Sequence, residues 1–389
     1  MTRRILIVPD KFKGSLSALE AAGAIARGWA AACPDDTLAL LPMSDGGDGF
    51  GPVMAGTLEL EKQVVEVVDA AGQARPAAWW FDSESGQAVV ETAQSNGLAL
   101  LPRGRSHPFD LDTRGVGQLL LAAGQAGAVH CLTGIGGSAT NDGGFGMARA
   151  LGWVFRDESG KPIEQWTRLD GLALIESPTS RAWPGVTVAS DVQNLLLGVD
   201  GATWVYGSQK GMRPEDFAKA DACLGRLAKV TAETLGSDFS VTPGAGAAGG
   251  LGFGLMAFAG ATIESGFEVF AKATELEAKV GEADFVVTAE GAIDEQTLMG
   301  KGTGQIAALC RRLGKPCIGL AGQLALGQAE VEPRKRLFWR LAALVPDLAS
   351  EPEAMANAAS HLEQLAKREG ILSSDTNFTD QHEAEKMDE

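Results

Sequence analysis

"ILIVPDKFKGSLSALEAAGAIARGWAAA", residues 5–32, is the stretch that decides the fold class. It begins with an unbroken apolar run that ends in a Pro-Asp pair, as in a strand buried on both faces of a parallel sheet. Apolar residues then recur at helical spacing from Leu16 to Trp29. A second apolar run follows at 37–43, so the chain opens with the β-α-β order of an open α/β sheet.

The same order returns towards the C-terminus. The patterns predict a strand and a loop at 284–294, a loop and a helix at 300–313, and strands at 315–323 and 337–347. Strands that alternate with helices in this way indicate a parallel sheet. Both ends of the chain therefore have the same α/β character.

The middle of the chain differs, because its short strand candidates are separated by long loops. We predict one discontinuous α/β domain made of residues 1–74 and 281–372, which carries an inserted central domain at residues 75–280. A length of 389 residues agrees with two domains. Residues 373–389 are polar, mostly acidic and without periodicity, so we expect a disordered tail.

The composition is that of a globular protein with a sizeable core, with 45% hydrophobic and 21% charged residues. The formal net charge of -17 argues against nucleic acid as a partner, because phosphate backbones are bound by stripes of Lys and Arg. No apolar stretch reaches the roughly 20 residues of a membrane span, and the N-terminal run is shorter than a signal-peptide core. We therefore expect a cytoplasmic protein without membrane contact.

Cysteine and histidine usage limits the chemistry. The five cysteines form no CxxC pair, and their odd number does not indicate a disulfide framework. With four histidines and no HExxH motif, a zinc site is not expected. Any metal would be a hard ion bound through oxygen atoms.

The loop "GIGGSATNDGG", residues 134–144, is the most distinctive motif. Its glycines let backbone N–H groups converge on an anion, and a loop between a strand and a helix N-terminus is where phosphate binds. The alternative is a structural turn in which Asn141 or Asp142 caps the helix, and spacing alone favours neither. The loop supplies candidate ligands for phosphate or substrate, which are Gly136, Gly137, Ser138, Thr140 and Asn141, and a candidate metal ligand, Asp142.

Five further loops carry the same residue types. Lysine suits a carboxylate or phosphate, and aspartate suits a cation or a hydroxyl donor. For each loop the alternative is a plain turn, a solvated loop or an Asx turn. These loops supply Lys11, Lys13, Ser15, Asp45, Asp48, Asp191, Asn194, Lys210, Glu290, Asp294 and Lys301.

Nucleotide fingerprints give a divided result. No GxxxxGK[ST] motif occurs, so the chain is not a P-loop kinase. "GAGAAGG", residues 244–250, matches GxGxxG, and Glu264 stands where a dinucleotide-binding fold places its acid, so an NAD-dependent oxidoreductase is one alternative. Pro243 directly before the motif and a poor strand upstream favour instead small residues packed against a helix.

Together the loops indicate phosphoryl transfer, in which positioning and charge neutralisation supply most of the catalysis. Lysines would neutralise developing charge, and carboxylate-bound Mg²⁺ would bridge phosphate oxygens. One aspartate would orient or deprotonate the attacking hydroxyl.

Several long motifs, in order, resemble the signature blocks of the bacterial glycerate kinase family, the non-P-loop enzymes of glyoxylate and galactarate metabolism. They include "PDKFKGSLSALEAA", "MSDGGDGF", "GIGGSATNDGGFGMARALG", "DVQNLLLGVDGATWVYGSQKG", "GAGAAGGLGFGL" and "AEGAIDEQTLMGKG". The resemblance implies ATP- and Mg²⁺-dependent phosphorylation of D-glycerate to 2-phosphoglycerate. It also implies a flavodoxin-like domain built from both chain ends, a central α/β domain, and an active site in the cleft between them.

The resemblance sharpens the expected roles. Asp191 is our choice for the residue that orients the substrate hydroxyl, and Lys11, Lys13 and Lys210 complete the catalytic set. Ser15, Asn194, Glu290 and Lys301 join the 134–144 loop in substrate or phosphate binding. The candidate metal ligands are Asp45, Asp48, Asp142 and Asp294.

The alternatives left open are 3-phosphoglycerate as the product and a non-catalytic module that binds sugar acids. Ala292 stands where the family often has an arginine, and what this does to substrate affinity is also open. So is the oligomeric state, a homo-oligomer included.

Overall fold

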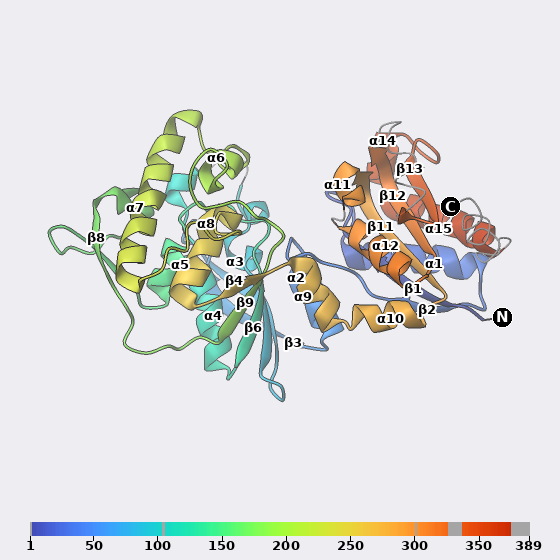
Figure 1. Ribbon diagram of the computed structural model, residues 1–389, viewed down its shortest axis with the longest axis horizontal. Helices are drawn as coiled ribbons and strands as arrows, with labels where there is room; N and C mark the ends of the chain where they lie inside the picture. Colours follow the sequence, from blue (N-terminus) through green and yellow to red (C-terminus); the bar gives the residue numbers. More distant parts are fainter. Residues whose placement is uncertain (1, 103–105, 300–301, 326–336, 375–389) are drawn as a thin grey trace. The chain divides into compact units, whose positions relative to one another are not determined.

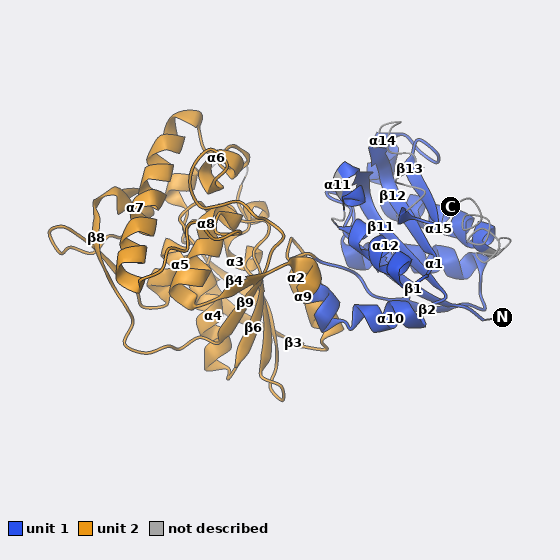
Figure 2. Ribbon diagram, in the orientation of Figure 1, with its two compact units in different colours: residues 1–44, 270–389 blue, residues 45–269 orange. Residues whose placement is uncertain are grey.

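The computed structural model describes residues 2–102, 106–299, 302–325 and 337–374. The chain forms two compact units, shown in blue and orange in Figure 2. Unit 1 contains residues 1–44 and 270–389, and unit 2 contains residues 45–269.

The five-stranded sheet of unit 1 is parallel throughout and runs in the order β13-β12-β11-β1-β2. Numbered along unit 1 alone, this is the order 2-1-3-4-5 of a flavodoxin-like fold, as the fold prediction required. The order reverses between β1 and β11, and ligands of such sheets bind beyond the carboxyl ends of the strands at that switch point. The strands are β1 (Arg4–Pro9), β2 (Thr37–Leu40), β11 (Phe285–Asp294), β12 (Cys317–Ala325) and β13 (Arg340–Val345).

Helix α1 covers this sheet together with α15, and it begins where the sequence offers a complete N-terminal signal. Ser17 and Glu20 form a capping box, in which each side chain bonds to the backbone N–H of the other. Gly28 lets the two helices approach closely, since a Cβ there would lie 2.1 Å from the carbonyl oxygen of Glu363. The helices of unit 1 are α1 (Ala18–Ala32), α10 (Leu276–Glu282), α11 (Glu295–Leu298), α12 (Thr303–Arg312), α14 (Glu351–Ala356) and α15 (Ala358–Ser374).

Unit 2 has a six-stranded sheet in the order β10-β9-β6-β5-β4-β3. Four strands are parallel, and β4 and β3 extend the sheet in antiparallel pairing. The strands are β3 (Glu61–Val68), β4 (Ala74–Asp82), β5 (Gln87–Glu91), β6 (His130–Gly134), β9 (Gly185–Ala189) and β10 (Thr262–Glu264) (Figure 1). A separate hairpin pairs β7 (Val154–Asp157) with β8 (Leu172–Glu176).

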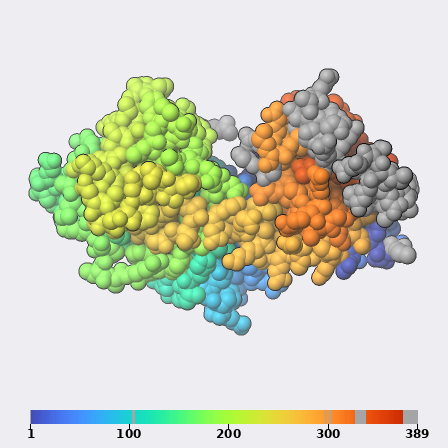
Figure 3. All heavy atoms as spheres, in the orientation of Figure 1, coloured from blue at the N-terminus to red at the C-terminus, as the bar shows by residue number. Residues whose placement is uncertain are grey.

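Helices surround this sheet, and its core contains a chain of aromatic contacts in which Phe155 and Phe253 both lie against Phe258, with ring centroids 5.5 and 6.1 Å away. Helix α7 forms part of the surface seen in Figure 3. The helices are α2 (Phe50–Thr57), α3 (Ala93–Asn96), α4 (Arg114–Gln125), α5 (Phe145–Ala150), α6 (Ala202–Tyr206), α7 (Phe217–Leu235) and α8 (Ala247–Gly254). Helix α9 (Gly266–Ala273) continues from unit 2 into unit 1.

The borders of the compact units differ from the predicted domain borders, which were 74/75 and 280/281. The units divide at 44/45 and 269/270. Strand β3 falls in unit 2 because it pairs along its whole length with β4. Of the tail predicted at 373–389, residues 373 and 374 are the last two of α15, and 375–389 lie outside the described residues. Within the described ranges no helix is both long and apolar enough to cross a membrane.

Candidate active site

Four parallel strands of unit 2 end at the same edge of its sheet, and the polar loops follow them there. The 134–144 loop leaves β6 and meets the loop 45–49, since Gly136 donates its N–H to the carbonyl oxygen of Gly46 at 3.0 Å. A Cβ on Gly136 would lie 2.5 Å from the Cα of Gly47. Gly137 has φ +73°, and a Cβ there would lie 1.8 Å from Asp48 Oδ1. Glycine is therefore required at both positions, because the loop 45–49 lies too close to leave room for a side chain.

The loop 45–49 is equally close to the end of β9 and to the start of α9. A Cβ on Gly46 would lie 2.0 Å from the carbonyl oxygen of Ala189, and one on Gly266 would lie 1.9 Å from that of Asp45. Unit 2 thus presents a carboxyl edge whose loops pack backbone against backbone. We call it the glycine-framed edge; its predicted site residues are Asp45, Asp48, Gly136, Gly137 and Asp191.

Asp191 follows β9 and is half-buried. Its Oδ1 accepts hydrogen bonds from the hydroxyl of Ser265 at 2.7 Å and from the N–H of Gly266 at 3.0 Å. Among the described residues no donor bonds to Oδ2. One oxygen therefore fixes the carboxylate, and the other remains an acceptor.

The two halves of the 134–144 loop have different surroundings. Gly136 is half-buried and Gly137 is exposed, whereas Thr140, Asn141 and Asp142 are each 0% exposed. Gly136 and Gly137 therefore reach solvent at the glycine-framed edge. The second half is internal, and its polar groups bond to other parts of unit 2.

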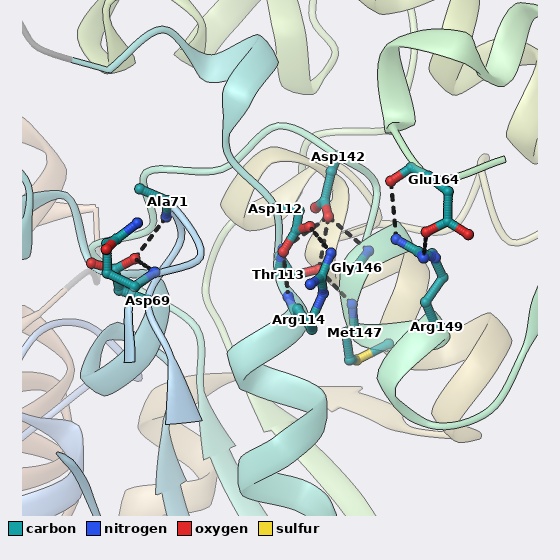
Figure 4. Close-up of polar contacts among 11 residues, drawn as sticks. Asp69, Ala71, Asp112, Thr113, Arg114, Asp142, Gly146, Met147, Arg149 and Glu164 are labelled. Atoms are coloured by element: carbon teal, nitrogen blue, oxygen red, sulfur yellow. Dashed lines mark hydrogen bonds and ion pairs between the residues drawn. The ribbon is translucent and has the colours of Figure 1, made fainter. Parts of the chain in front are cut away.

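Asp142 illustrates the internal half (Figure 4). Its Oδ2 accepts the N–H and hydroxyl of Thr113, each at 2.9 Å, and the N–H of Gly146 at 2.9 Å, while Oδ1 accepts the N–H of Gly144 at 3.1 Å. Burial, reinforced by the negative charge of Asp112 and opposed by these bonds, raises the pKa of Asp142 to about 6. This carboxylate, considered above as a metal ligand, is occupied by protein donors and ties the start of α5 to that of α4.

Lys210 also points into unit 2. Its Nζ donates to the carbonyl oxygen of Thr140 at 2.7 Å, and the side chain is buried. Burial lowers the pKa of Lys210 to about 7, although the charge of Asp142 acts in the opposite direction. A Cβ on Gly249 would lie 2.8 Å from this Nζ, so a glycine leaves room for the ammonium group.

The remaining predicted polar residues of unit 2 hold loops together. Ser138 and Thr140 have hydroxyl oxygens 3.0 Å apart, and Asn96 donates to Ser138 at 3.2 Å. Asn141 donates to the hydroxyl of Thr203 at 2.9 Å. Asn194 accepts the Tyr206 hydroxyl at 2.7 Å and donates to the carbonyl of residue 200 at 2.8 Å.

The "GAGAAGG" segment does not have the strand-turn-helix context of a dinucleotide fingerprint. It follows α7 and a run of turns at 236–246 that contains no strand. Ala248, Gly249 and Gly250 have φ values of 55°, 72° and 83°. Gly254, just beyond the segment, packs against Gly144, where a Cβ would lie 2.7 Å from the Gly254 Cα. The glycines serve close packing against the 134–144 loop.

In unit 1, the predicted residues lie at the switch point between β1 and β11. Asp10 donates its N–H to the carbonyl oxygen of Ala289 at 2.7 Å, and its side chain accepts the N–H of Lys11 at 2.7 Å. Lys11 is half-buried and Lys13 is exposed. Ser15 bonds to the carbonyl of residue 12 at 3.2 Å and so stabilises the turn that carries both lysines.

Glu290 is the central acid of this switch-point edge. Its Oε1 accepts the hydroxyls of Thr297, at 2.9 Å, and Thr303. Burial, opposed by these hydroxyls and reinforced by the charges of Asp10 and Asp294, raises the pKa of Glu290 to about 7. The structure brings Glu290 together with Asp294, which accepts the Thr297 N–H at 3.2 Å. Lys301 lies outside the described residues.

Among the residues that the structure describes, no three His, Cys, Asp or Glu side chains are grouped to hold a metal ion. Magnesium does not require such a group, because it is commonly bound by one or two carboxylates together with substrate phosphates and water. The oxygen-only donors of Asp45 and Asp48 fit that mode.

Sequence reasoning missed Glu91 and Thr113. Glu91 ends the apolar run "AVVE" at 88–91, and an acid at that position was a usable signal for a residue at the carboxyl edge. Thr113 gave no local signal, because its partner Asp142 is far away in the sequence and the pairing depends on the fold.

The chain is a two-unit α/β enzyme of the phosphotransferase class. It has a flavodoxin-like sheet, a second sheet with a glycine-framed edge, and acids and lysines in place of a P-loop. A model of the glycerate kinase family matches residues 5–372. The chain therefore belongs to the glycerate kinase family.

Individual relatives agree along nearly the whole chain. The chain is 40% identical to a glycerate kinase of Halalkalibacterium halodurans, over 95% of this chain and 98% of that protein. It is 37% identical to the glycerate 2-kinase of Escherichia coli K12, over 82% and 85%. It also superimposes on the crystal structure of a putative glycerate kinase 2 from Salmonella typhimurium LT2, with 35% identity, a TM-score of 0.81, and coverage of 96% and 99%.

Proposed function

We propose that this enzyme transfers a phosphoryl group from Mg-ATP to the 2-hydroxyl of D-glycerate, giving 2-phosphoglycerate in the glyoxylate metabolism of the cytoplasm. The observation that carries the proposal is the Asp191 carboxylate, which is fixed through Oδ1 and keeps Oδ2 as an acceptor at the glycine-framed edge. The names of the relatives support glycerate as the acceptor and ATP as the donor.

Asp191 would act on the acceptor hydroxyl. Oδ2 would accept the hydroxyl proton, orient the oxygen and take up the proton as the new P–O bond forms. Gly136 and Gly137 border the same edge, and because they lack side chains the loop that carries Asp45 and Asp48 packs directly against them.

Lys11 and Lys13 are our proposed phosphate ligands in unit 1. They follow β1 at the switch point, where doubly wound sheets bind their ligands, and their charges would neutralise phosphate oxygens. Asp45 and Asp48 are the proposed holders of Mg²⁺ in unit 2, which when bound would neutralise negative charge on the transferred group. Asp142 and Lys210 we assign to positioning, because both bond within unit 2.

The test is release of ADP from ATP in the presence of Mg²⁺ and D-glycerate, with phosphorus NMR of the product. We expect 2-phosphoglycerate; 3-phosphoglycerate would overturn the regiochemistry, and no turnover with D-glycerate or related hydroxy acids would overturn the function.

The Asp191→Asn variant tests the carrying observation. We expect kcat to fall by about 100- to 10,000-fold, the usual contribution of a general base. Asp200→Asn, an exposed position in the same unit, is the matched control and should retain full activity. Near-wild-type turnover of Asp191→Asn would remove Asp191 from the mechanism.

A further inference from the structure

Glu91 has a position that its sequence context does not explain. It is the last residue of β5, its side chain is 5% exposed, and each carboxylate oxygen accepts one backbone N–H. Oε1 accepts the N–H of Gly49 at 2.9 Å, and Oε2 accepts that of Gly51 at 3.1 Å. These N–H groups flank the first residue of α2, where helix amides lack partners and the dipole favours a negative charge.

The segment that Glu91 binds is the continuation of the loop 45–49. A Cβ on Gly51 would lie 2.1 Å from the ring of Trp80, so the start of α2 is confined on that side. On the other side the loop contacts Gly136 and Ala189 through its backbone. Glu91 is therefore a side chain that fixes a loop whose other contacts are mainly backbone.

We propose that Glu91 is a positioning residue for the bound hydroxy acid: it sets the place of Asp45 and Asp48 at the glycine-framed edge. This inference rests on the proposed function, since it assigns that edge to D-glycerate. Glu91 itself touches neither substrate nor nucleotide in the proposal. It acts through the loop, so its loss should lower the turnover of D-glycerate and raise the Mg²⁺ concentration that the reaction needs, since Asp45 and Asp48 are the proposed holders of Mg²⁺.

The chemistry explains why a carboxylate is needed. Two N–H donors face the two oxygens, and both oxygens are free of a donor O–H only while the group is ionised. In Glu91→Gln one oxygen becomes an NH₂ group that faces an N–H, so one hydrogen bond is replaced by a repulsive donor pair. Glu91→Asp keeps both acceptors and shortens their reach by one methylene.

Asp82→Asn is the matched control for Glu91→Gln. Asp82 ends β4 in the same sheet, at the opposite edge from Glu91. Its two oxygens also accept one backbone N–H each, from Glu84 and Ser85, both at 3.0 Å. Oδ2 of Asp82 also accepts the hydroxyl of Ser85. The control thus makes the same chemical change at a carboxylate that bonds two backbone N–H groups, away from the glycine-framed edge.

The experiment has a kinetic and a structural readout. In Glu91→Gln we expect kcat/KM for D-glycerate to fall by about 100-fold, the effect of a displacement near 1 Å at a reacting centre, with a higher Mg²⁺ concentration needed for half-maximal activity. Backbone amides of residues 45–57 should exchange hydrogen faster. Glu91→Asp should lie between wild type and Glu91→Gln, and Asp82→Asn should match wild type in both readouts.

Two results would overturn the inference. Unchanged exchange at 45–57 would show that Glu91 does not fix the loop, and faster exchange with unchanged kcat/KM would show that the loop position does not matter. If Glu91→Gln does not fold, the same comparison is made with Glu91→Asp. A wild-type enzyme that is inactive on D-glycerate would refute the proposed function, while the exchange measurement would still report on the Glu91 contact.

Discussion

Each unit of the molecule has a glutamate at the carboxyl edge of its sheet, Glu290 within β11 and Glu91 at the end of β5, and the two glutamates are held in opposite ways. Glu290 of unit 1 bonds to the hydroxyls of Thr297 and Thr303, and its pKa is raised to about 7. Glu91 of unit 2 bonds to backbone N–H groups at the start of a helix. The switch-point edge of unit 1 is therefore built from side chains, whose charge responds to pH. The glycine-framed edge of unit 2 is built from backbone, which allows little change.

The difference teaches where each unit tolerates substitution. A side-chain edge loses one interaction when one residue is replaced. A backbone edge has no such freedom, because a single added methyl group displaces a neighbouring loop.

Gly46→Ala should destabilise the protein most. A small loss of stability would contradict the contrast between the backbone edge of unit 2 and the side-chain edge of unit 1. Gly46 has φ +91°, and a Cβ would lie 2.0 Å from the carbonyl oxygen of Ala189. Left-handed backbone costs an alanine about 1–2 kcal/mol and overpacking about 1–3 kcal/mol more. We therefore expect the free energy of unfolding of unit 2 to fall by about 2–5 kcal/mol, measured by denaturant titration, with loss of most activity.

Gly72→Ala is the control for this substitution. Gly72 has φ +80°, and nothing lies within 4 Å of the Cβ that it lacks. Gly72→Ala should lower the free energy of unfolding only by the cost of the left-handed backbone, about 1–2 kcal/mol, and the variant should retain activity. Equal effects of the two substitutions would show that close approach at the glycine-framed edge is unimportant.

Lys13→Met tests the side-chain edge and should have an intermediate effect. Removing one exposed cation from the proposed phosphate site should raise KM for ATP by about 10-fold, which corresponds to a hydrogen bond to a charged group. The free energy of unfolding should be unchanged. Lys279→Met, exposed in α10 of the same unit, should leave KM unaltered, and a similar rise there would assign the effect to net charge alone.

Thr303→Val should give the smallest effect and would sharpen the contrast between the edges. The Thr303 hydroxyl stabilises the ionised form of Glu290, so its removal raises the pKa of that carboxyl further. If a pKa near 7 is seen in the pH profile of kcat/KM, Thr303→Val should raise that pKa by about one pH unit. A profile that stays in place would separate Glu290 from the rate-determining chemistry.

The same shift has a consequence for stability. Glu290 has a higher pKa in the folded chain, about 7, than the ordinary 4.5. The folded state therefore binds more protons between these values, and its stability falls as pH rises through that window. Thr303→Val should extend the fall to higher pH in denaturant titrations.

Much of unit 1 could be predicted because its signals are local. The apolar runs that become β1, β12 and β13 are short and continuous, and Ser17 with Glu20 marks the start of α1. Strand β11 is longer than predicted, because 290–294 continue the pairing with β12 rather than forming a loop.

The sequence is least informative where a contact joins distant residues. The predicted domain border and the border of the compact units differ at β3, a largely exposed edge strand whose place is decided by pairing with β4. The roles of Asp142 and Lys210 could not be read from residue type, because burial and the partners Thr113 and Thr140 decide them. Asp191 lies two residues beyond the end of β9, in one of the polar loops that the sequence singled out.

The contact between Gly266 and Asp45 has a consequence for how the chain is assembled. Unit 2 begins at residue 45 and ends at residue 269, and these two stretches of backbone touch. A continuous segment whose ends lie together can be inserted into another domain without separating the ends of the host. The polypeptide therefore enters and leaves unit 2 through a single point, as expected if an independent ancestral domain had been spliced into a flavodoxin-like host.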